Sequence, residues 1–262
     1  MQASKRAKRL VVVGDVHGQY EPFVTLLQHA GLIDENLNWT GSRDRVIQMG
    51  DILDRGPCVK ETEALLDKMQ AQAVRSGGEV IRLVGNHELE VLLSNFTICG
   101  LEKKDAVLLR DKMTSQVLNG LLRAAYGYKG FLFTHAGVTR RLYKIFQLQL
   151  DDANAHNVAV LINLIFKESI KHQFFKHPIF NISVSRAGTD KFGGIFWEDL
   201  VDLAESFPQS PIWQVVGHTP IERIIIDETS RIIPVDVGLH RKLQYLVIDE
   251  SGTPQICEVP QK

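Results

Sequence analysis

The chain has 262 residues, of which 44% are hydrophobic and 23% are charged, and its formal net charge is -1. This composition is typical of a globular protein, and the length suits one large α/β domain or at most two domains. The near-zero charge excludes a strongly basic nucleic-acid-binding protein, and no apolar run approaches the roughly 20 residues of a membrane span. We therefore expect no nucleic-acid partner and no membrane partner.

Three cysteines are scattered along the chain without paired spacing, at Cys58, Cys99 and Cys257. Neither a disulfide framework nor a zinc ribbon is predicted, so we expect a reducing compartment. No signal peptide is recognisable, because the apolar run at residues 10–13 is too short for one. The expected location is the cytoplasm, and export without a cleaved signal stays open.

The chain begins with a short basic segment, and residues 1–9 are predicted to be a disordered tail in solvent. Residues 10–262 are predicted to form one domain, because no repeat or low-complexity linker divides them. Apolar runs predict strands, in order, at residues 10–13, 46–49, 80–84, 130–134 and 212–216. Helical spacing of apolar side chains predicts helices at residues 21–30 and 60–75. This alternation indicates an α/β layered domain.

Two long segments lack strand patterning and are predicted to be helical insertions, at about residues 89–128 and 139–181. Four apolar runs follow near the end of the chain, at residues 223–226, 232–235, 243–247 and 255–259. Because turn-forming residues separate these runs, we expect them to close the fold as antiparallel strands.

Five short polar motifs each follow an apolar run. They are Gly14-Asp15-Val16-His17-Gly18, Gly50-Asp51-Ile52-Leu53-Asp54-Arg55-Gly56, Gly85-Asn86-His87-Glu88, His135-Ala136-Gly137 and Gly217-His218-Thr219-Pro220. Strands that end in this way bring Asp, Asn and His side chains to one edge of a sheet, where the sites of open α/β folds lie. These side chains supply oxygen and nitrogen ligands suited to Mn, Fe or Zn. A metal site at this edge is therefore predicted.

The five motifs, in this order, resemble those of the phosphoprotein phosphatase superfamily of binuclear metallophosphoesterases. The resemblance extends from Asp15 to His218, and residues 72–88 are similar to the bacterial-type Shewanella-like phosphatases. The resemblance implies an α/β fold, built on a calcineurin-like metallophosphoesterase β-sandwich that is flanked by helices and carries helical insertions.

The resemblance also implies two divalent metal ions per chain, with Mn favoured and Fe or Zn as alternatives. The residues that match the metal ligands of the family are Asp15, His17, Asp51, Asn86, His135 and His218. Asp51 would bridge the two ions, and a hydroxide between the ions would attack phosphorus in line.

Three further residues match catalytic positions of the family. His87 is implied to protonate the leaving oxygen, Asp54 to orient His87, and Arg55 to clamp the phosphate in a bidentate manner. Asn86 is implied to contact the phosphate as well. Glu88 is expected to support the loop rather than to react.

One position departs from the pattern of the family. Several bacterial-type relatives carry a phosphate-binding arginine just after a tryptophan, whereas here Trp197 is followed by Glu and Asp. Arg186 is the predicted substitute, and two further candidates are Arg140 and Arg141. The alternative for each of the three is a solvated side chain. His240 lies where relatives place residues that line the site, and its role is left open.

The predicted function is that of a metal-dependent phosphomonoesterase acting on phosphorylated proteins or peptides. One alternative is a hydrolase of symmetrical diadenosine tetraphosphate or related nucleotides, because that branch shares every motif. Another is a metal-binding scaffold with a vestigial site, which the missing arginine favours and the intact His87, Asp54 and Arg55 oppose. The sequence does not distinguish phosphoserine, phosphothreonine and phosphotyrosine, and it sets no oligomeric state.

Overall fold

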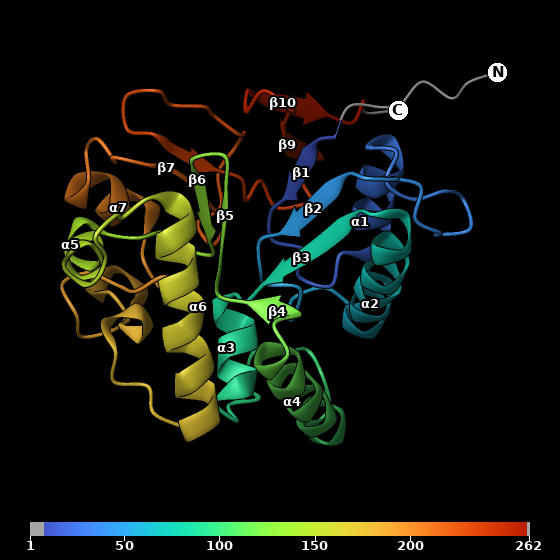
Figure 1. The fold of residues 1–262 in the computed structure, drawn as a ribbon. Helices are drawn as coiled ribbons and strands as arrows, with labels where there is room; N and C mark the ends of the chain where they lie inside the picture. The colour runs from blue at the N-terminus through green and yellow to red at the C-terminus, as the bar shows by residue number, and fades with distance from the viewer. Residues whose placement is uncertain (1–7, 261–262) are drawn as a thin grey trace.

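Two mixed β-sheets form the centre of the protein in a computed structural model that describes residues 8–260 (Figure 1). The first sheet has the strand order β10-β9-β1-β2-β3-β4, and the second has the order β5-β6-β7-β8. The strands are β1 (Leu10–Val13), β2 (Arg45–Gln48), β3 (Glu79–Leu83), β4 (Leu122–Arg123), β5 (Ala125–Tyr128), β6 (Phe131–Thr134), β7 (Trp213–Val216), β8 (Ile232–Pro234), β9 (Gln244–Ile248) and β10 (Pro254–Glu258). The helices are α1 (Tyr20–His29), α2 (Val59–Ser76), α3 (Asn86–Leu92), α4 (Lys103–Leu118), α5 (Arg140–Gln149), α6 (Ala155–His172) and α7 (Leu200–Ser206), with 3-10 turns at Pro178–Phe180 and Val184–Arg186.

Each sheet contains a set of parallel strands. In the first sheet β1, β2, β3 and β4 run parallel, and β9 pairs antiparallel with β1. In the second sheet β6, β7 and β8 run parallel. Parallel neighbours need a crossover connection, and helices α1 and α2 provide the crossovers from β1 to β2 and from β2 to β3 (Figure 1).

The two sheets pack face to face around a shared apolar core. Successive side chains of a strand point to opposite faces of its sheet. Leu10 and Val12 of β1 therefore lie in the core between the sheets, together with Phe133 of β6. Val11 and Val13 point the other way and pack in the core beneath the helices. The predicted β-sandwich flanked by helices is confirmed.

The first predicted helical insertion is wrong at its C-terminal end, because residues 122–128 form β4 and β5. Helix α4 stops before Gly120, which has a left-handed φ of 74°. The side chain of Asn163 on α6 then accepts hydrogen bonds from the backbone N–H groups of Ala124 and Ala125, at 2.9 and 3.2 Å. These bonds hold the segment extended against α6.

The predicted strand at residues 223–226 is wrong as well, because this segment is a loop. The N–H of Ile224 donates to Oε1 of Gln244 at 2.9 Å, so a side chain satisfies the backbone here instead of a neighbouring strand. β8 pairs parallel with β7, although an antiparallel strand was expected, whereas β9 and β10 form the expected antiparallel pair.

The predicted basic tail falls mostly outside the described residues, which begin at residue 8. Arg9 belongs to the described part and is half-buried instead of solvated. Its Nε donates to Oδ2 of Asp44 at 2.9 Å, which ties the starts of the neighbouring strands β1 and β2 together. Among the helices of residues 8–260, none combines the length and apolar character needed to cross a membrane.

Candidate active site

Three parallel strands from each sheet end in one region, and polar side chains follow each of them. These residues are Asp15 and His17 after β1, Asp51 after β2, Asn86 and His87 after β3, His135 after β6, His218 after β7 and Asp236 after β8. Every one of them is at most 9% exposed. We call these eight residues the metal-site cluster, and it contains all six predicted metal ligands.

Asp51 lies at the centre of this cluster. Its Oδ2 faces three imidazoles, at 3.6 Å from Nε2 of His17, 3.8 Å from Nε2 of His87 and 3.4 Å from Nε2 of His135. Its Oδ1 accepts a hydrogen bond from the backbone N–H of His87 at 3.0 Å. Burial alone would raise the pKa of Asp51, but the surrounding histidines hold it well below its ordinary value.

Backbone carbonyls set the tautomers of the three histidines around Asp51. The Nδ1 atoms of His17, His87 and His135 lie 2.8, 3.0 and 3.0 Å from the carbonyl oxygens of Leu53, Ile98 and Met49. A carbonyl oxygen only accepts, so each Nδ1 carries a hydrogen and each Nε2 faces the centre of the cluster. This is the orientation that metal-binding histidines require.

Two groups of residues have donor atoms close enough to share a metal ion. One is His17, Asp51 and His87, and the other is Asp51, His135 and His218. Nε2 of His218 is buried and has no hydrogen-bond partner among the described residues, although a buried nitrogen normally has one. Oxygen and imidazole donors with such an unpaired nitrogen fit a divalent transition metal.

Asp15 stands slightly apart from these two groups. Its carboxylate accepts hydrogen bonds from the backbone N–H of His218, at 3.2 and 3.1 Å. Burial and the neighbouring carboxylate of Asp236 raise the pKa of Asp15 well above its ordinary value. The imidazole of His135 and the N–H of His218 act against this increase but do not cancel it.

The backbone around the site is strained in several places. Left-handed φ values occur at five predicted site residues, which are His17 (47°), Asp51 (52°), Asp54 (67°), Arg55 (62°) and His218 (65°). Such values cost energy in residues other than glycine and persist where the surroundings enforce them.

Glu88 enforces part of this geometry. Its carboxylate accepts hydrogen bonds from the backbone N–H groups of Asp51 (2.6 Å), Gly85 (2.8 Å), Ile52 (2.9 Å) and Leu53 (3.3 Å). Four backbone donors on one buried carboxylate hold the Asp51 loop against α3, which is the supporting role that the sequence predicted for Glu88.

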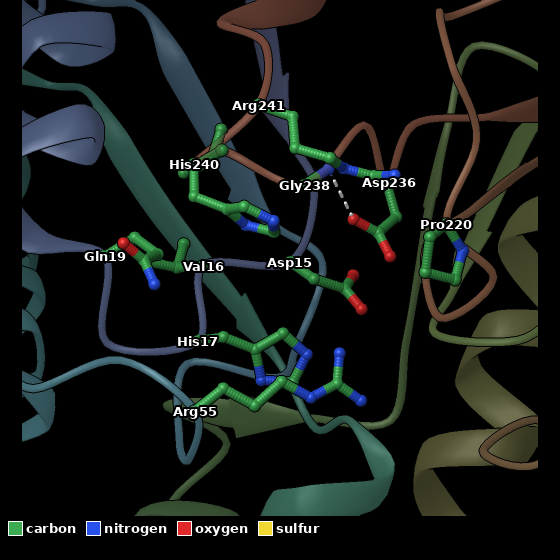
Figure 2. Close-up of a pocket in the computed structure, with 11 residues that line it drawn as sticks. Asp15, Val16, His17, Gln19, Arg55, Pro220, Asp236, Gly238, His240 and Arg241 are labelled. Atoms are coloured by element: carbon green, nitrogen blue, oxygen red, sulfur yellow. Dashed lines mark hydrogen bonds between the residues drawn. The ribbon is translucent and has the colours of Figure 1, made fainter.

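The predicted catalytic residues Asp54 and Arg55 lie at the rim of the cluster. Oδ2 of Asp54 is 3.5 Å from Nδ1 of His87. Arg55 is exposed and makes no ion pair with a described residue. Its guanidinium faces a cavity of about 250 Å³ that Asp15 and Asp236 also line (Figure 2).

The structure brings Arg186 close to the site. Arg140 and Arg141 lie on the first turn of α5 and form no hydrogen bond or ion pair with the metal-site cluster among the described residues. Nη2 of Arg186 lies 3.0 Å from Oδ2 of Asp199 and 2.5 Å from Oγ1 of Thr219, the residue after His218. Its Nε is buried without a hydrogen-bond partner among residues 8–260. The acidic residue that stands two positions after Trp197 thus holds a nearby arginine in place.

One residue of the cluster, Asp236, was not predicted as part of the site. It is 3% exposed and lines the same cavity as Asp15, His17 and Arg55 (Figure 2). A signal was present in the sequence, because an apolar run followed by Asp, one residue and Gly is similar to the pattern around Asp51 and Asp15. His240, whose role the sequence left open, lines the outer part of the cavity.

A family model described as calcineurin-like phosphoesterase matches residues 8–231. The match covers most of the chain, so the chain belongs to the calcineurin-like phosphoesterase family. Within that family, the Shewanella-like protein phosphatase 1 of Plasmodium berghei (strain Anka) is 38% identical over 256 residues, which are 92% of this chain and 66% of that protein. The Shewanella-like protein phosphatase 2 of Arabidopsis thaliana is 35% identical over 133 residues, which are 48% of this chain and 34% of that protein.

The chain therefore spans 34% and 66% of the lengths of these two relatives. Among solved structures, a cold-active protein tyrosine phosphatase superposes with a TM-score of 0.68 at 20% identity, over 95% of this chain and 78% of that one. At this identity the superposition supports the fold alone. The predicted resemblance to phosphoprotein phosphatases is confirmed.

Proposed function

We propose that the protein is a phosphomonoesterase that uses two divalent metal ions to remove phosphate from phosphoproteins. The position of Asp51 carries this proposal, because its carboxylate belongs to both groups of residues that could hold a metal ion. Burying several acids and imidazoles together is costly without a bound cation. Two metal ions that share Asp51 would account for this arrangement.

The ligands of the two ions would be Asp15, His17 and Asp51 on one side, and Asp51, Asn86, His135 and His218 on the other. His87 belongs to the first donor group by distance, but we assign it to catalysis instead. When bound, the ions would draw charge from the phosphoryl oxygens and lower the pKa of a water between them. The ions in our proposal are Mn²⁺, which the resemblance to the family favours, and the donor set also admits Fe or Zn. The unpaired Nε2 of His218 supports a resident ion at this position.

His87 is the proposed general acid. Its Nδ1 is held by the carbonyl of Ile98 at 3.0 Å and faces Oδ2 of Asp54 at 3.5 Å. These contacts fix the ring and direct Nε2 toward the site, from where it protonates the leaving oxygen of the alcohol. Asp54 orients His87 and stabilises its charged form, as a carboxylate does for other catalytic histidines.

Arg55, Asn86 and Arg186 are the proposed phosphate-binding residues. The guanidinium of Arg55 faces the cavity and has no carboxylate partner among the described residues, so it can bind two phosphoryl oxygens (Figure 2). Arg186 is oriented by Asp199, and a phosphoryl oxygen could satisfy its unpaired Nε. Asp199 would thus supply, through Arg186, the arginine that is missing after Trp197.

A phosphoprotein substrate is proposed because the similarity to Shewanella-like protein phosphatases extends over most of the chain. The test begins with protein that is stripped of metal by a chelator and restored with Mn²⁺. We would then compare kcat/KM for a phosphothreonine peptide, a phosphotyrosine peptide and diadenosine tetraphosphate. We expect hydrolysis only after Mn²⁺ is restored, with a preference for the peptides.

The other outcomes would each overturn a part of the proposal. A strong preference for the dinucleotide would assign the protein to nucleotide hydrolysis with the same site residues. Bound metal without hydrolysis of any of the three would favour the scaffold alternative. As an internal control, His87→Asn should lower kcat by about 10²–10⁴-fold, with the metal content unchanged.

A matched pair of variants tests the role of Arg186. Arg186→Met should raise KM for the phosphopeptide by about tenfold or more, because a charged hydrogen bond to phosphate is lost. Arg141→Met changes an exposed arginine on the first turn of α5 and should leave KM unchanged. An effect of the second variant that equals the first would instead favour Arg141 as the substitute.

A further inference from the structure

The strands of the two sheets contribute to the metal-site cluster in a symmetrical way, with one exception. Each of the six parallel strands β1, β2, β3, β6, β7 and β8 is followed by a buried polar residue of the cluster. Five of these strands carry a residue with a role in the proposed function. The sixth, β8, leads to Asp236, for which that function gives no role.

The proposed ligands are also unevenly divided between the two ions. Apart from the shared Asp51, the ion on the second-sheet side would have three ligands of its own, which are Asn86, His135 and His218. The other ion would have only Asp15 and His17. Asp236 lines the cavity beside these two residues, with its carboxylate directed toward that of Asp15 (Figure 2).

The carboxylate of Asp236 has spare capacity to bind a cation. Its Oδ1 accepts a hydrogen bond from the N–H of Gly238 at 2.9 Å, which closes a local turn. Its Oδ2 has no hydrogen-bond partner among the described residues, and neither oxygen pairs with a described Lys, Arg or His. The residue is only 3% exposed, and it lines the cavity with a carboxylate oxygen that has no described hydrogen-bond donor.

The carboxylates of Asp236 and Asp15 face each other across the cavity (Figure 2), and no described lysine or arginine forms an ion pair with either of them. Two buried carboxylates that face each other in this way are stable together when a cation lies between them.

We propose that Asp236 is a further oxygen donor of the metal centre, serving the ion on the Asp15 and His17 side. The proposal rests on the proposed function, which supplies the two ions. It makes the two sides alike, since each ion would then have three residues of its own in addition to the shared Asp51.

The test measures metal binding, independently of turnover. Asp236→Asn keeps an oxygen that accepts from Gly238 but removes the negative charge. Mn²⁺ would be titrated calorimetrically into metal-free protein, and the metal content after dialysis would be counted. The wild type should bind two ions, and Asp236→Asn should bind one of them about 10–100-fold more weakly, with the other unchanged.

Asp227→Asn is the matched control. Asp227 forms the same kind of turn, accepting from the N–H of Thr229 at 2.8 Å, but it is exposed and lies outside the cavity. This variant should bind both ions as the wild type does. If Asp236→Asn does not fold, Asp236→Ser gives the same test, because its hydroxyl can also accept from Gly238.

Three results would overturn the proposal. Equal Mn²⁺ affinities in Asp236→Asn and the wild type would make Asp236 a residue of the turn only. A raised KM for substrate with unchanged metal affinities would make it a partner of Arg55. A wild-type protein that binds no Mn²⁺ would remove the proposed function itself, and with it this inference, whereas the first two results would leave that function intact.

Discussion

Two groups of charged side chains lie buried or half-buried in this protein, and they differ in how their charges are balanced. The ion-pair cluster consists of Arg82 on β3, Glu63 and Asp67 on α2, and Lys112 on α4. Arg82 pairs with Glu63 and, at 3.0 Å, with Asp67. Lys112 pairs with the same two acids, at 2.8 Å from Glu63. Two positive charges thus meet two negative charges.

The metal-site cluster has no such balance. It contains three carboxylates, those of Asp15, Asp51 and Asp236, and no lysine or arginine forms an ion pair with any of them among the described residues. The imidazole of His135, whose pKa is raised to about 10 by Asp51 and Asp15, balances part of this charge, but Asp15 and Asp236 also face each other. Burial of an uncompensated charge opposes folding, so a site of this kind persists because of what it binds. The ion-pair cluster connects helices to the sheet, whereas the metal-site cluster provides the chemistry.

The largest effect should follow from changing the shared carboxylate of the metal-site cluster. Asp51→Asn removes the charge on which both proposed ions depend, so kcat/KM should fall by more than about 100-fold. Asparagine tolerates the left-handed backbone at this position, where φ is 52°, so the fold should be kept. Phosphopeptide turnover and circular dichroism of the same sample would check both statements, and activity close to wild type would contradict the proposed centre.

A substitution in the ion-pair cluster should lower the stability of the protein and leave its activity unchanged. Arg82→Met leaves the buried Glu63 with only the partly exposed Lys112, and the free energy of unfolding should fall by about 3–5 kcal/mol. Urea unfolding measures this loss. The kcat of the remaining folded protein should stay at the wild-type value, because Arg82 touches no residue of the metal-site cluster. A matching loss of kcat would show that the two clusters are coupled.

The two clusters also differ in how far the sequence predicts them. Six of the metal-site residues were predicted as ligands because each follows an apolar strand within a motif whose spacing is local. A related local pattern exists at Asp236, but the sequence predicts an antiparallel strand before it, and such a strand would not bring Asp236 to this edge. The parallel pairing of β8 with β7 is what brings Asp236 to the same edge.

No local pattern reveals the ion-pair cluster. Arg82 lies between apolar residues in a predicted strand, and Glu63 and Asp67 are four residues apart on a predicted helix, where charges usually face solvent. Only the packing of α2 against β3, together with the reach of Lys112 from α4, brings their charges together. For the same reason the sequence offered three arginines as substitutes near the site, and the contact between Arg186 and Asp199 became visible only in the structure.

The difference in charge balance also predicts how metal binding depends on pH. Burial would lower the pKa of His135, but the carboxylates of Asp51 and Asp15 raise it to about 10. The metal-free protein therefore gains stability from this proton below the ordinary value of 6.5 and loses it as the pH rises toward about 10. A metal ion at Nε2 must displace the proton, so Mn²⁺ affinity should rise about tenfold per pH unit for each proton released.

Calorimetric titration with Mn²⁺ near neutral pH, in two buffers of different ionisation enthalpy, would count the released protons. We expect at least one proton from the wild type. Lys112→Met alters only the ion-pair cluster and should release the same number, at a lower overall stability. Mn²⁺ binding without proton release would show that His135 is neutral before the metal arrives.

The smallest expected effect is on the Tm of the metal-free protein, and its sign should differ between the two clusters. Burial and the facing carboxylate of Asp236 raise the pKa of Asp15, so the metal-free protein loses stability as the pH rises from the ordinary value of 3.8 through the raised pKa, and the loss persists at higher pH. Asp15→Asn removes that charge and keeps an oxygen that accepts from the N–H of His218. The Tm of the metal-free protein should therefore rise by a few degrees near neutral pH, while Mn²⁺ binding weakens.

The same substitution in the ion-pair cluster, Asp67→Asn, should lower Tm, because its carboxylate pairs with Arg82 and Lys112. Thermal unfolding of both variants in a chelator, and again with Mn²⁺, gives the comparison. With Mn²⁺, the Tm of Asp15→Asn should instead lie below that of the wild type. The wild type binds the ion more tightly and is therefore stabilised more by it. If Asp15→Asn lowered Tm in the chelator as well, the carboxylate of Asp15 would already be compensated by the protein, and the two clusters would not differ in the way their charges are balanced.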